Sequence, residues 1–200
     1  QLEKLIQAGA LDSMHQNRAF LFDNVVNFVQ IFGGNKIVST QQSIFFEDTK
    51  INIEDKKIFS HDVDIWTSTI KLNYELDVIG FYFSNHPLSY YPQYFFNEIG
   101  VINYDEVISK QDLQKALLVG SILDIKERSN KDGKKYAFIT VSNQNHQFEM
   151  TIFNDTIAKY KDFLNEGFTL LFHVNISRDN ENLRIIIRKI ENLEKIYNNK

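Results

Sequence analysis

The sequence predicts an α+β protein in which a small helical subdomain precedes a five-stranded antiparallel β-barrel. Residues 119–153 hold three stretches of alternating apolar and polar residues, the pattern of half-buried strands. A basic, glycine-containing turn joins the first two stretches, and a short polar turn joins the second to the third. A helix of about ten residues and two more alternating stretches are expected to follow. This order of elements is that of the OB fold, a barrel that commonly binds oligonucleotides.

Composition narrows the class of protein. The 200 residues suffice for one large or two small domains, and 43% hydrophobic content can supply packed cores. The absence of cysteine excludes disulfides and thiolate metal sites and fits a reducing cytoplasm. No apolar run approaches the roughly 20 residues of a membrane span. The chain opens inside an expected helix without an initiator Met, so we expect a cytoplasmic fragment of a longer protein with no membrane partner.

The net charge of −4 is unevenly divided along the chain. Residues 1–115 carry 9 Lys and Arg against 15 Asp and Glu, whereas residues 116–200 carry 13 against 11. Much of the basic excess lies between Lys126 and Lys135. Because phosphate binding depends on local charge more than on the whole-chain sum, the barrel-like half is the expected place for nucleic acid.

Helical periodicity is expected mainly in the first half of the chain. The pattern predicts a helix at Leu2–Ala8, a second at Arg18–Phe32 with Asn17 as its N-cap, and a third at about Leu72–Phe83. Residues 88–115 are ambiguous and become helical near Asp105–Lys115. We therefore expect four segments: a helical part at 1–34, an acidic linker at 35–65, a helical connector at 66–115 and the OB-fold domain at 116–200.

Period-two alternation assigns the strand residues to two faces of the barrel. Ala137, Ile139 and Val141 are expected inside, which leaves the aromatic side chains of Tyr136 and Phe138 outside. Exposed aromatic rings on an OB sheet can stack on bases, at about 1–3 kcal/mol per base. The predicted cationic contacts to phosphates are Lys126, Arg128, Lys131, Lys134, Lys135, Arg184 and Arg188. The alternative is that the helical half covers both rings and the lysines form a solvated turn.

Catalytic interpretations find little support. The pair Asp62-Val63-Asp64 has the spacing of metal-binding carboxylates but lies in an acidic stretch, where a solvated charge run is the better explanation. The five histidines show no ligand spacing. Ser84 and His86, which could suggest a nucleophile and a base, are better explained by capping and packing beside a proline. We expect no catalytic residue, metal ligand or cofactor in this chain.

Four stretches resemble one family along almost the whole chain. The resemblance is to the C-terminal region of the bacterial DNA polymerase III alpha subunit, of the DnaE type. The stretches are L-E-K-L-I-Q-A-G-A-L-D-S with N-R-A (Leu2–Ser13, Asn17–Ala19), E-L-D-V-I-G-F-Y-F-S-N-H-P (Glu75–Pro87), N-K-D-G-K-K-Y-A-F-I-T-V (Asn130–Val141) and F-E-M-T-I-F (Phe148–Phe153). Departures from the family pattern are Asn85, Asn130, Asn143 and His146, the last two at the turn between the second and third strands.

The same resemblance suggests a role for the acidic linker. Gln41-Gln42-Ser43-Ile44-Phe45 resembles the peptide with which this family binds the sliding clamp. An extended peptide would insert Ile44 and Phe45 into an apolar cleft, while Gln41 forms hydrogen bonds at its rim and Ser43 lies between them. The alternative is a short apolar patch that anchors the linker to its own domain.

The resemblance implies a non-catalytic piece of a Mg²⁺-dependent DNA-directed DNA polymerase. Residues 1–34 would end its duplex-binding region, and the OB fold would bind single-stranded template DNA. The expected partners are single-stranded and primer-template DNA and the sliding clamp, in the nucleoid. Two alternatives stay open: an OB-fold module that docks another replisome subunit, and an RNA-binding OB domain such as a tRNA anticodon-binding domain.

Overall fold

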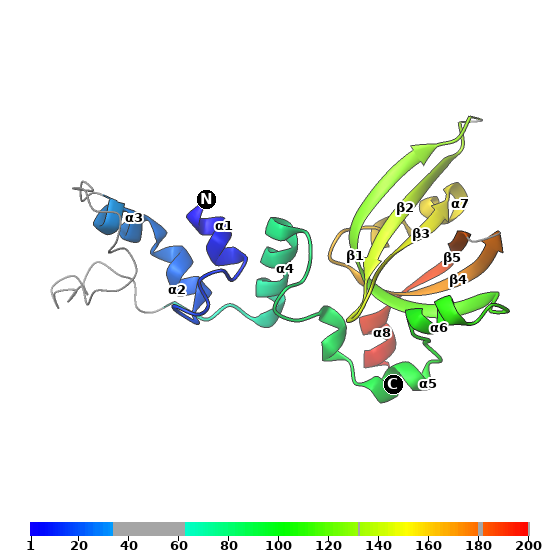
Figure 1. Ribbon diagram of the computed structural model, residues 1–200, viewed down its shortest axis with the longest axis horizontal. Helices are drawn as coiled ribbons and strands as arrows, with labels where there is room; N and C mark the ends of the chain where they lie inside the picture. Colours follow the sequence, from blue (N-terminus) through cyan, green and yellow to red (C-terminus); the bar gives the residue numbers. More distant parts are fainter. Residues whose placement is uncertain (34–62, 132, 180–181, 200) are drawn as a thin grey trace. The chain divides into compact units, whose positions relative to one another are not determined.

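The computed structural model describes residues 1–33, 63–131, 133–179 and 182–199 (Figure 1). The chain divides into two compact units, Gln1–Ile79 and Gly80–Lys200. This division falls inside the predicted connector, so 66–79 belongs to the first unit and 80–115 to the second. Among the described residues, no helix has both the length and the apolar character needed to cross a membrane.

The first unit contains the helices α1 (Leu2–Gln7), α2 (Arg18–Asp23), α3 (Val25–Gly33) and α4 (Ser68–Ile79). The predicted N-cap is confirmed, because the Asn17 side chain accepts a hydrogen bond from the backbone N–H of Phe20. The single helix predicted over Arg18–Phe32 is wrong, since the chain breaks at Asn24. The side-chain amide of Asn24 donates to the Phe20 carbonyl at 2.9 Å and so competes with the helical backbone.

The helix predicted at Leu72–Phe83 begins and ends four residues earlier, as α4. Its start is set by Thr67, whose hydroxyl accepts a hydrogen bond from the Ile70 N–H at 3.3 Å. Its end comes before Gly80, which has a φ of +79°. The expectation relied on the apolar spacing and missed both of these local signals.

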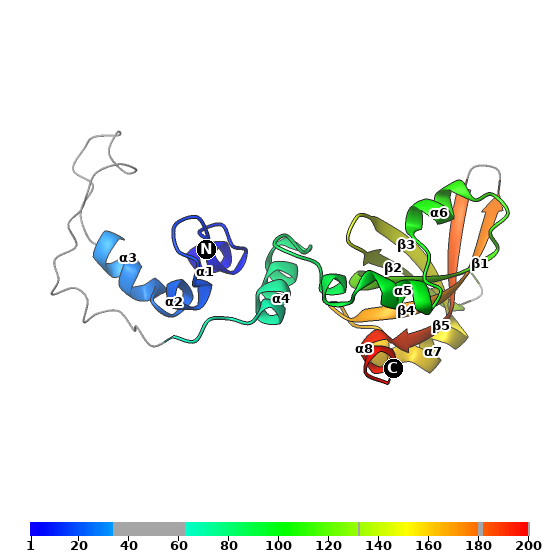
Figure 2. The ribbon, with the colours of Figure 1, turned by 90° about the horizontal axis from the view of Figure 1, so that it is seen from below.

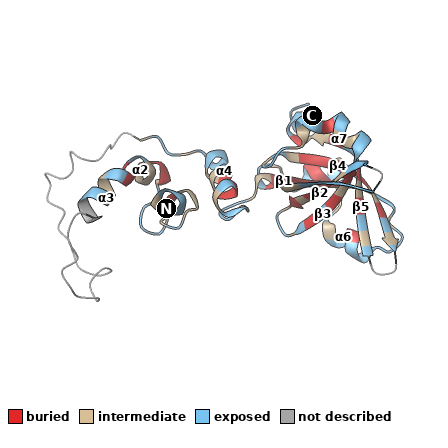
Figure 3. Ribbon diagram, turned by 90° about the horizontal axis from the view of Figure 1, so that it is seen from above, coloured by how far each residue is buried: buried red, intermediate tan, exposed pale blue. Residues whose placement is uncertain are grey.

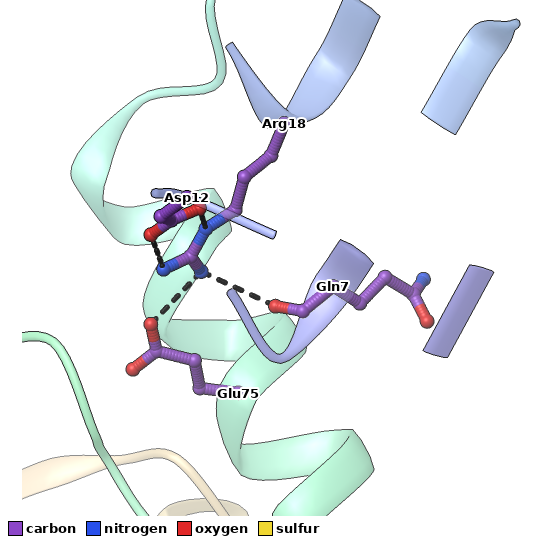
Figure 4. A network of polar contacts seen from close by, with 4 residues as sticks. All are labelled: Gln7, Asp12, Arg18 and Glu75. Atoms are coloured by element: carbon purple, nitrogen blue, oxygen red, sulfur yellow. Dashed lines mark hydrogen bonds and ion pairs between the residues drawn. The ribbon is translucent and has the colours of Figure 1, made fainter. Parts of the chain in front are cut away.

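A buried polar cluster joins α1, α2 and α4 (Figure 4). The Arg18 guanidinium donates to both carboxylate oxygens of Asp12, at 2.8 and 2.6 Å, and to Glu75 at 2.9 Å. It also donates to the Gln7 carbonyl at 3.2 Å. The hydrogen bond to Asp12 raises the pKa of Arg18 against the opposing effect of burial, and Glu75 raises it further.

The cluster leaves no room for a side chain at position 9. A Cβ atom on Gly9 would lie 2.2 Å from Arg18 Nη2, and the glycine has a φ of +81° that other residues rarely adopt. Gly9, Asp12 and Arg18 lie in the first stretch that carries the resemblance, and Glu75 begins the second. Their structural role is therefore to assemble this unit.

Removing one partner should leave a buried charge without compensation. We expect Glu75→Ala to lower the free energy of unfolding of the first unit by about 3 kcal/mol. Trp66, the single tryptophan of the sequence, packs against Phe22 and Tyr74, so its fluorescence during urea unfolding reports on this unit. The matched control is Glu106→Gln, which breaks an exposed ion pair with Lys110 and should change little. Equal urea midpoints for the two variants would contradict the role of the cluster.

The second unit is built on five strands that form a closed barrel in the order β1-β2-β3-β5-β4. The strands are β1 (Lys115–Ser129), β2 (Lys135–Ser142), β3 (Gln147–Phe153), β4 (Thr169–Asp179) and β5 (Asn182–Asn192). The fully antiparallel barrel of the prediction is wrong at one pairing, because β3 and β5 run parallel at Thr151 and Ile186. A closed ring with an odd number of strands cannot alternate direction throughout, so one parallel pair is unavoidable.

The interior of the barrel follows the predicted alternation (Figure 3). Ala137, Ile139 and Val141 are at most 1% exposed, which confirms that this set faces inward. Between β3 and β4 lie α7 (Asn154–Tyr160) and the short 3₁₀ helix η3 (Lys161–Phe163). Tyr160 of α7 is buried in the barrel core. The helix therefore supplies part of the apolar core that the strands enclose.

One part of the outer surface of the barrel is covered by helices. The 80–115 region forms η2 (Pro87–Tyr90), α5 (Gln93–Glu98) and α6 (Tyr104–Ser109), and α8 (Leu193–Asn198) follows β5. Figures 1 and 2 both place α5 and α8 beside each other. Phe95, Phe96 and Leu193 pack against Val119 of β1 and Leu171 of β4 in a second apolar cluster. The outer sides of these two strands are thus buried at that end of the barrel.

Candidate nucleic-acid interface

The outer face of β1, β2 and β3 carries three rows of cross-strand neighbours. Side chains at paired positions of adjacent antiparallel strands lie on the same side of the sheet. From the β1–β2 turn inward, the rows are Arg128–Tyr136–Phe153, Lys126–Phe138–Thr151 and Asp124–Thr140–Glu149. Cations and aromatic rings therefore occupy the two rows nearest the turn, and two carboxylates occupy the third.

The aromatic rings lie together on this face. Tyr136 and Phe138 are half-buried, and their ring centroids are 5.5 Å apart in an edge-to-face arrangement. Phe153, the partner of Tyr136 on β3, is 46% exposed. Phe153 is not among the predicted site residues, because a sequence alone does not give the register that brings it beside Tyr136.

Cationic side chains border the aromatic rows. Arg128 is exposed beside Tyr136, while Lys126 is exposed and forms a 2.8 Å ion pair with Asp124. The hydrogen bond from Lys126 lowers the pKa of Asp124, and the same contact raises the pKa of Lys126. Lys126 must therefore loosen this pair before it binds a phosphate, whereas Arg128 has no such competitor among the described ion pairs.

The β1–β2 turn presents Lys131 and Lys134, and Lys135 is the first residue of β2; all three are exposed. Asn130 shapes the turn, since its side-chain oxygen accepts from the Lys134 N–H at 2.8 Å and its own N–H donates to the Lys134 carbonyl at 2.9 Å. The structure thus brings Lys126, Arg128, Tyr136 and Phe138 together on one face and places the lysine turn at its end.

Arg184 and Arg188 do not belong to these rows. Both are exposed on β5, which borders β3 at the single parallel pairing. Arg188 instead lines a separate groove with Lys115. The predicted clamp-binding residues Gln41, Ser43, Ile44 and Phe45 lie outside the described residues, and their role stays a prediction.

His86 and Pro87 connect η2 to the end of β2, and we call this connection the latch. His86 Nδ1 accepts a hydrogen bond from the Leu88 N–H at 3.1 Å and so caps η2, which Pro87 begins. Since Nδ1 accepts, the proton of the neutral ring is on Nε2, which lies 3.0 Å from the Ser142 hydroxyl at the end of β2. Burial lowers the pKa of His86 to about 4. Capping and packing therefore account for this histidine, and a general-base role with Ser84 is not needed.

Two of the departures from the family pattern, Asn143 and His146, lie in the β2–β3 turn. The Asn143 side-chain oxygen accepts from the N–H groups of Asn145 and His146, at 3.0 and 2.7 Å. Asn143 therefore organises this turn. His146 Nε2 lies 3.0 Å from a carboxylate oxygen of Asp105, which links the turn to α6.

The described ranges contain no candidate metal site. No three His, Asp or Glu side chains there lie in an arrangement that could hold a metal ion. The site is a surface of rings and cations. Such a surface can bind and orient a polyanion.

Comparison with known proteins shows which proteins the chain is similar to. A family model described as an OB-fold nucleic acid binding domain (tRNA anti-codon type) matches residues 116–193. The DNA polymerase III subunit alpha of Neisseria meningitidis serogroup A is 28% identical over 197 residues, covering 96% of this chain and 16% of that protein. The subunit of the same name from Bacillus subtilis is 26% identical over 198 residues, covering 96% of this chain and 17% of that protein.

The chain is related to a segment of the DNA polymerase III alpha subunit. This confirms the resemblance predicted from the sequence, and the family match confirms an OB fold. The chain spans about a sixth of the length of these alpha subunits. Among solved structures, the mitochondrial single-stranded DNA binding protein Rim1 of S. cerevisiae gives a TM-score of 0.36 at 16% identity, covering 42% of this chain and 96% of that chain. A likeness at this level supports no inference.

The latch should make the second unit sensitive to acid. The unfolded state binds a proton at His86 near pH 6.5, whereas the folded state does so only near pH 4. The stabilisation is therefore complete above pH 6.5 and is lost as the pH falls toward 4. We expect a loss of about 1 to 2 kcal/mol, since the ring keeps some contact with water.

The measurement is urea unfolding followed by far-UV circular dichroism across this pH range, with Trp66 fluorescence monitoring the first unit separately. His86→Gln removes the titrating group and should flatten the pH dependence. Parallel pH profiles for the wild type and His86→Gln would show that the latch does not titrate in this way.

Proposed function

We propose that the second unit binds single-stranded DNA on the outer face of β1–β3, as part of a bacterial DNA polymerase III alpha subunit. The observation that carries the proposal is the pair of rows in which Arg128 and Lys126 lie beside Tyr136, Phe138 and Phe153. Aromatic rings that accept bases and cations that follow the phosphates are the two components of single-strand sites. In the whole protein, this unit would hold the template near a Mg²⁺-dependent polymerase centre.

The arrangement favours a single strand over a duplex. Bases in a duplex are stacked on each other, so rings such as Tyr136 and Phe138 can reach only bases that are unpaired. The carboxylates of Asp124 and Glu149 in the third row repel phosphates and limit the strand to the end near the lysine turn. Lys131, Lys134 and Lys135 supply phosphate contacts there, and Arg184 is the candidate for a contact beyond β3.

The aromatic contribution can be tested by fluorescence anisotropy with a labelled single-stranded oligonucleotide. We expect the double variant Tyr136→Ala, Phe138→Ala to weaken binding at least tenfold at all sequences, because each lost stack removes about 1–3 kcal/mol. Phe153→Ala should weaken it less, as a single ring. Tyr94→Ala is the control, since this tyrosine is 67% exposed on α5, away from the rows.

The cationic contribution appears in the salt dependence of the same binding. Each phosphate contact on a single strand adds about 0.7 to the slope of log K against log salt. Arg128→Ala and Lys134→Ala should each reduce the slope by somewhat less than one unit, whereas Lys195→Ala on α8 should not.

Unchanged affinity in the aromatic double variant together with a flat salt response would leave the protein-interaction alternative. Tighter binding of a matched RNA oligonucleotide would favour the RNA-binding alternative.

We also propose that Gln41–Phe45 binds the sliding clamp, on the support of the sequence pattern and the family relationship. Because the peptide and the DNA face belong to one chain, clamp binding would raise the effective concentration of the unit at DNA. Replacing Ile44 and Phe45 together by alanine should abolish binding to an immobilised bacterial clamp in surface plasmon resonance. The control is Ile51→Ala with Ile53→Ala, which removes two apolar residues outside the pattern. Loss of binding in both variants would indicate nonspecific hydrophobic binding by the linker.

A further inference from the structure

A second basic surface lies over β4, β5 and the first residues of β1. Two adjoining cavities of about 560 and 530 Å³ share Leu113, Lys115, Asn175 and Arg188. We call this surface the β4–β5 groove. Pairing along the strands gives its arrangement, since Asn175 of β4 is the cross-strand neighbour of both Lys115 and Ile186. These residues therefore share the outer side of the barrel.

The floor of the groove is aliphatic. Leu117 lines the first cavity and Ile186 lines the second. Ile186 is only half-buried and belongs to neither of the two apolar clusters of this unit, although the isoleucines on either side of it face the core. An aliphatic side chain on the outer face of a closed barrel contributes nothing to that core. It is the kind of residue that a bound partner would cover.

The rim of the groove is positively charged. Lys115 and Arg188 are exposed, and neither forms an ion pair within the described parts of the chain. Two other outward cations of the barrel are paired, Lys126 with Asp124 and Lys189 with Glu191. Arg178 adds a third cation to the second cavity, where it donates to the carbonyls of Val107 and Ile108.

Carboxylates reduce this charge only in part. Among the described residues that line the two cavities, Asp112 is the one acidic side chain. His173 also lines the first cavity, but it is hydrogen-bonded to Glu191 outside the lining. Three cations against one carboxylate leave the groove positive, over an apolar floor.

We propose that the β4–β5 groove binds an acidic peptide segment of another protein, with at least one large aliphatic or aromatic side chain seated on the floor. Charge complementarity and the apolar floor define this occupant together. No Phe, Tyr or Trp lines either cavity in the described part of the chain, and the one aromatic ring of the lining there, His173, is hydrogen-bonded to Glu191, so the groove offers bases little to stack on. We therefore expect a single DNA strand to bind more weakly here than on the rows of Tyr136 and Phe138.

The proposal can be tested on the full chain with a labelled peptide of about ten residues in which aspartate alternates with leucine. Fluorescence anisotropy should detect binding at low salt. Replacing the leucines by serine, or the aspartates by asparagine, should weaken it at least about tenfold, because each change removes one of the two complementary features.

Two pairs of charge reversals distinguish the groove from the DNA face. Lys115→Glu with Arg188→Glu should weaken the peptide at least about tenfold and leave the affinity for a single-stranded oligonucleotide within about twofold. Arg128→Glu with Lys134→Glu is the matched control and should do the reverse. Ile186→Ser should weaken the peptide while leaving both charged surfaces intact, and its urea midpoint checks that the barrel is still folded.

Three results would overturn the proposal. The first is a wild-type chain that fails to bind the acidic peptide at low salt. The second is peptide binding that survives the reversal of Lys115 and Arg188. The third is an oligonucleotide that loses as much affinity in this variant as in the Arg128 and Lys134 control, which would make the groove part of the DNA path. Because the DNA arm is measured separately, failure of the peptide arm says nothing against the single-strand site.

Discussion

Closure of the barrel depends on β1, which pairs with two different strands. Lys115–Ser121 pairs with β4, and Ser121–Ser129 pairs with β2, so the strand must bend sharply where its two partners meet. Gly120 lies at this point, where a Cβ atom would come within 2.1 Å of a Val141 methyl carbon and 2.8 Å of the Ser142 carbonyl oxygen. The register shift between Ile122 and Asp124 adds to the bend. A side chain at position 120 would therefore push β1 away from the end of β2.

The tilt that accompanies closure decides which side chains meet outside. Starting from Lys126 and following partners through Phe138, Thr151, Ile186 and Asn175, the path returns to β1 at Lys115, eleven residues earlier. Strands this strongly staggered spread one strand's residues over different parts of the surface. β1 therefore supplies Lys126 and Arg128 to the aromatic face and Lys115 to the β4–β5 groove. The single long strand β1 therefore places cations on two separate surfaces of the barrel. One surface is aromatic and the other is aliphatic.

Alternation along the strands was enough to predict the interior of the barrel and the outward position of Tyr136 and Phe138. It could not predict that Phe153 lies beside Tyr136, or that Arg188 lies beside Lys115. The pattern within one strand does not determine its register with a neighbouring strand. The antiparallel expectation failed for a topological reason, the odd number of strands in a ring. The helix boundaries failed at Asn24, Thr67 and Gly80, where side-chain capping and a glycine outweighed apolar spacing.

Two of the stretches that carry the resemblance supply side chains held inside the fold, whereas the other two, Asn130–Val141 and Phe148–Phe153, contain Tyr136, Phe138 and Phe153 of the candidate surface. Gly9, Arg18 and Glu75 are committed to one buried cluster, and His86 uses both ring nitrogens to hold η2 on the end of β2. A side chain with all of its polar atoms engaged inside the fold has none left for a ligand. Cations such as Arg128, by contrast, are fixed only by the strand that carries them. The chemistry of each barrel surface therefore depends on what surrounds its outward-facing cations: aromatic rings on one surface and aliphatic side chains on the other.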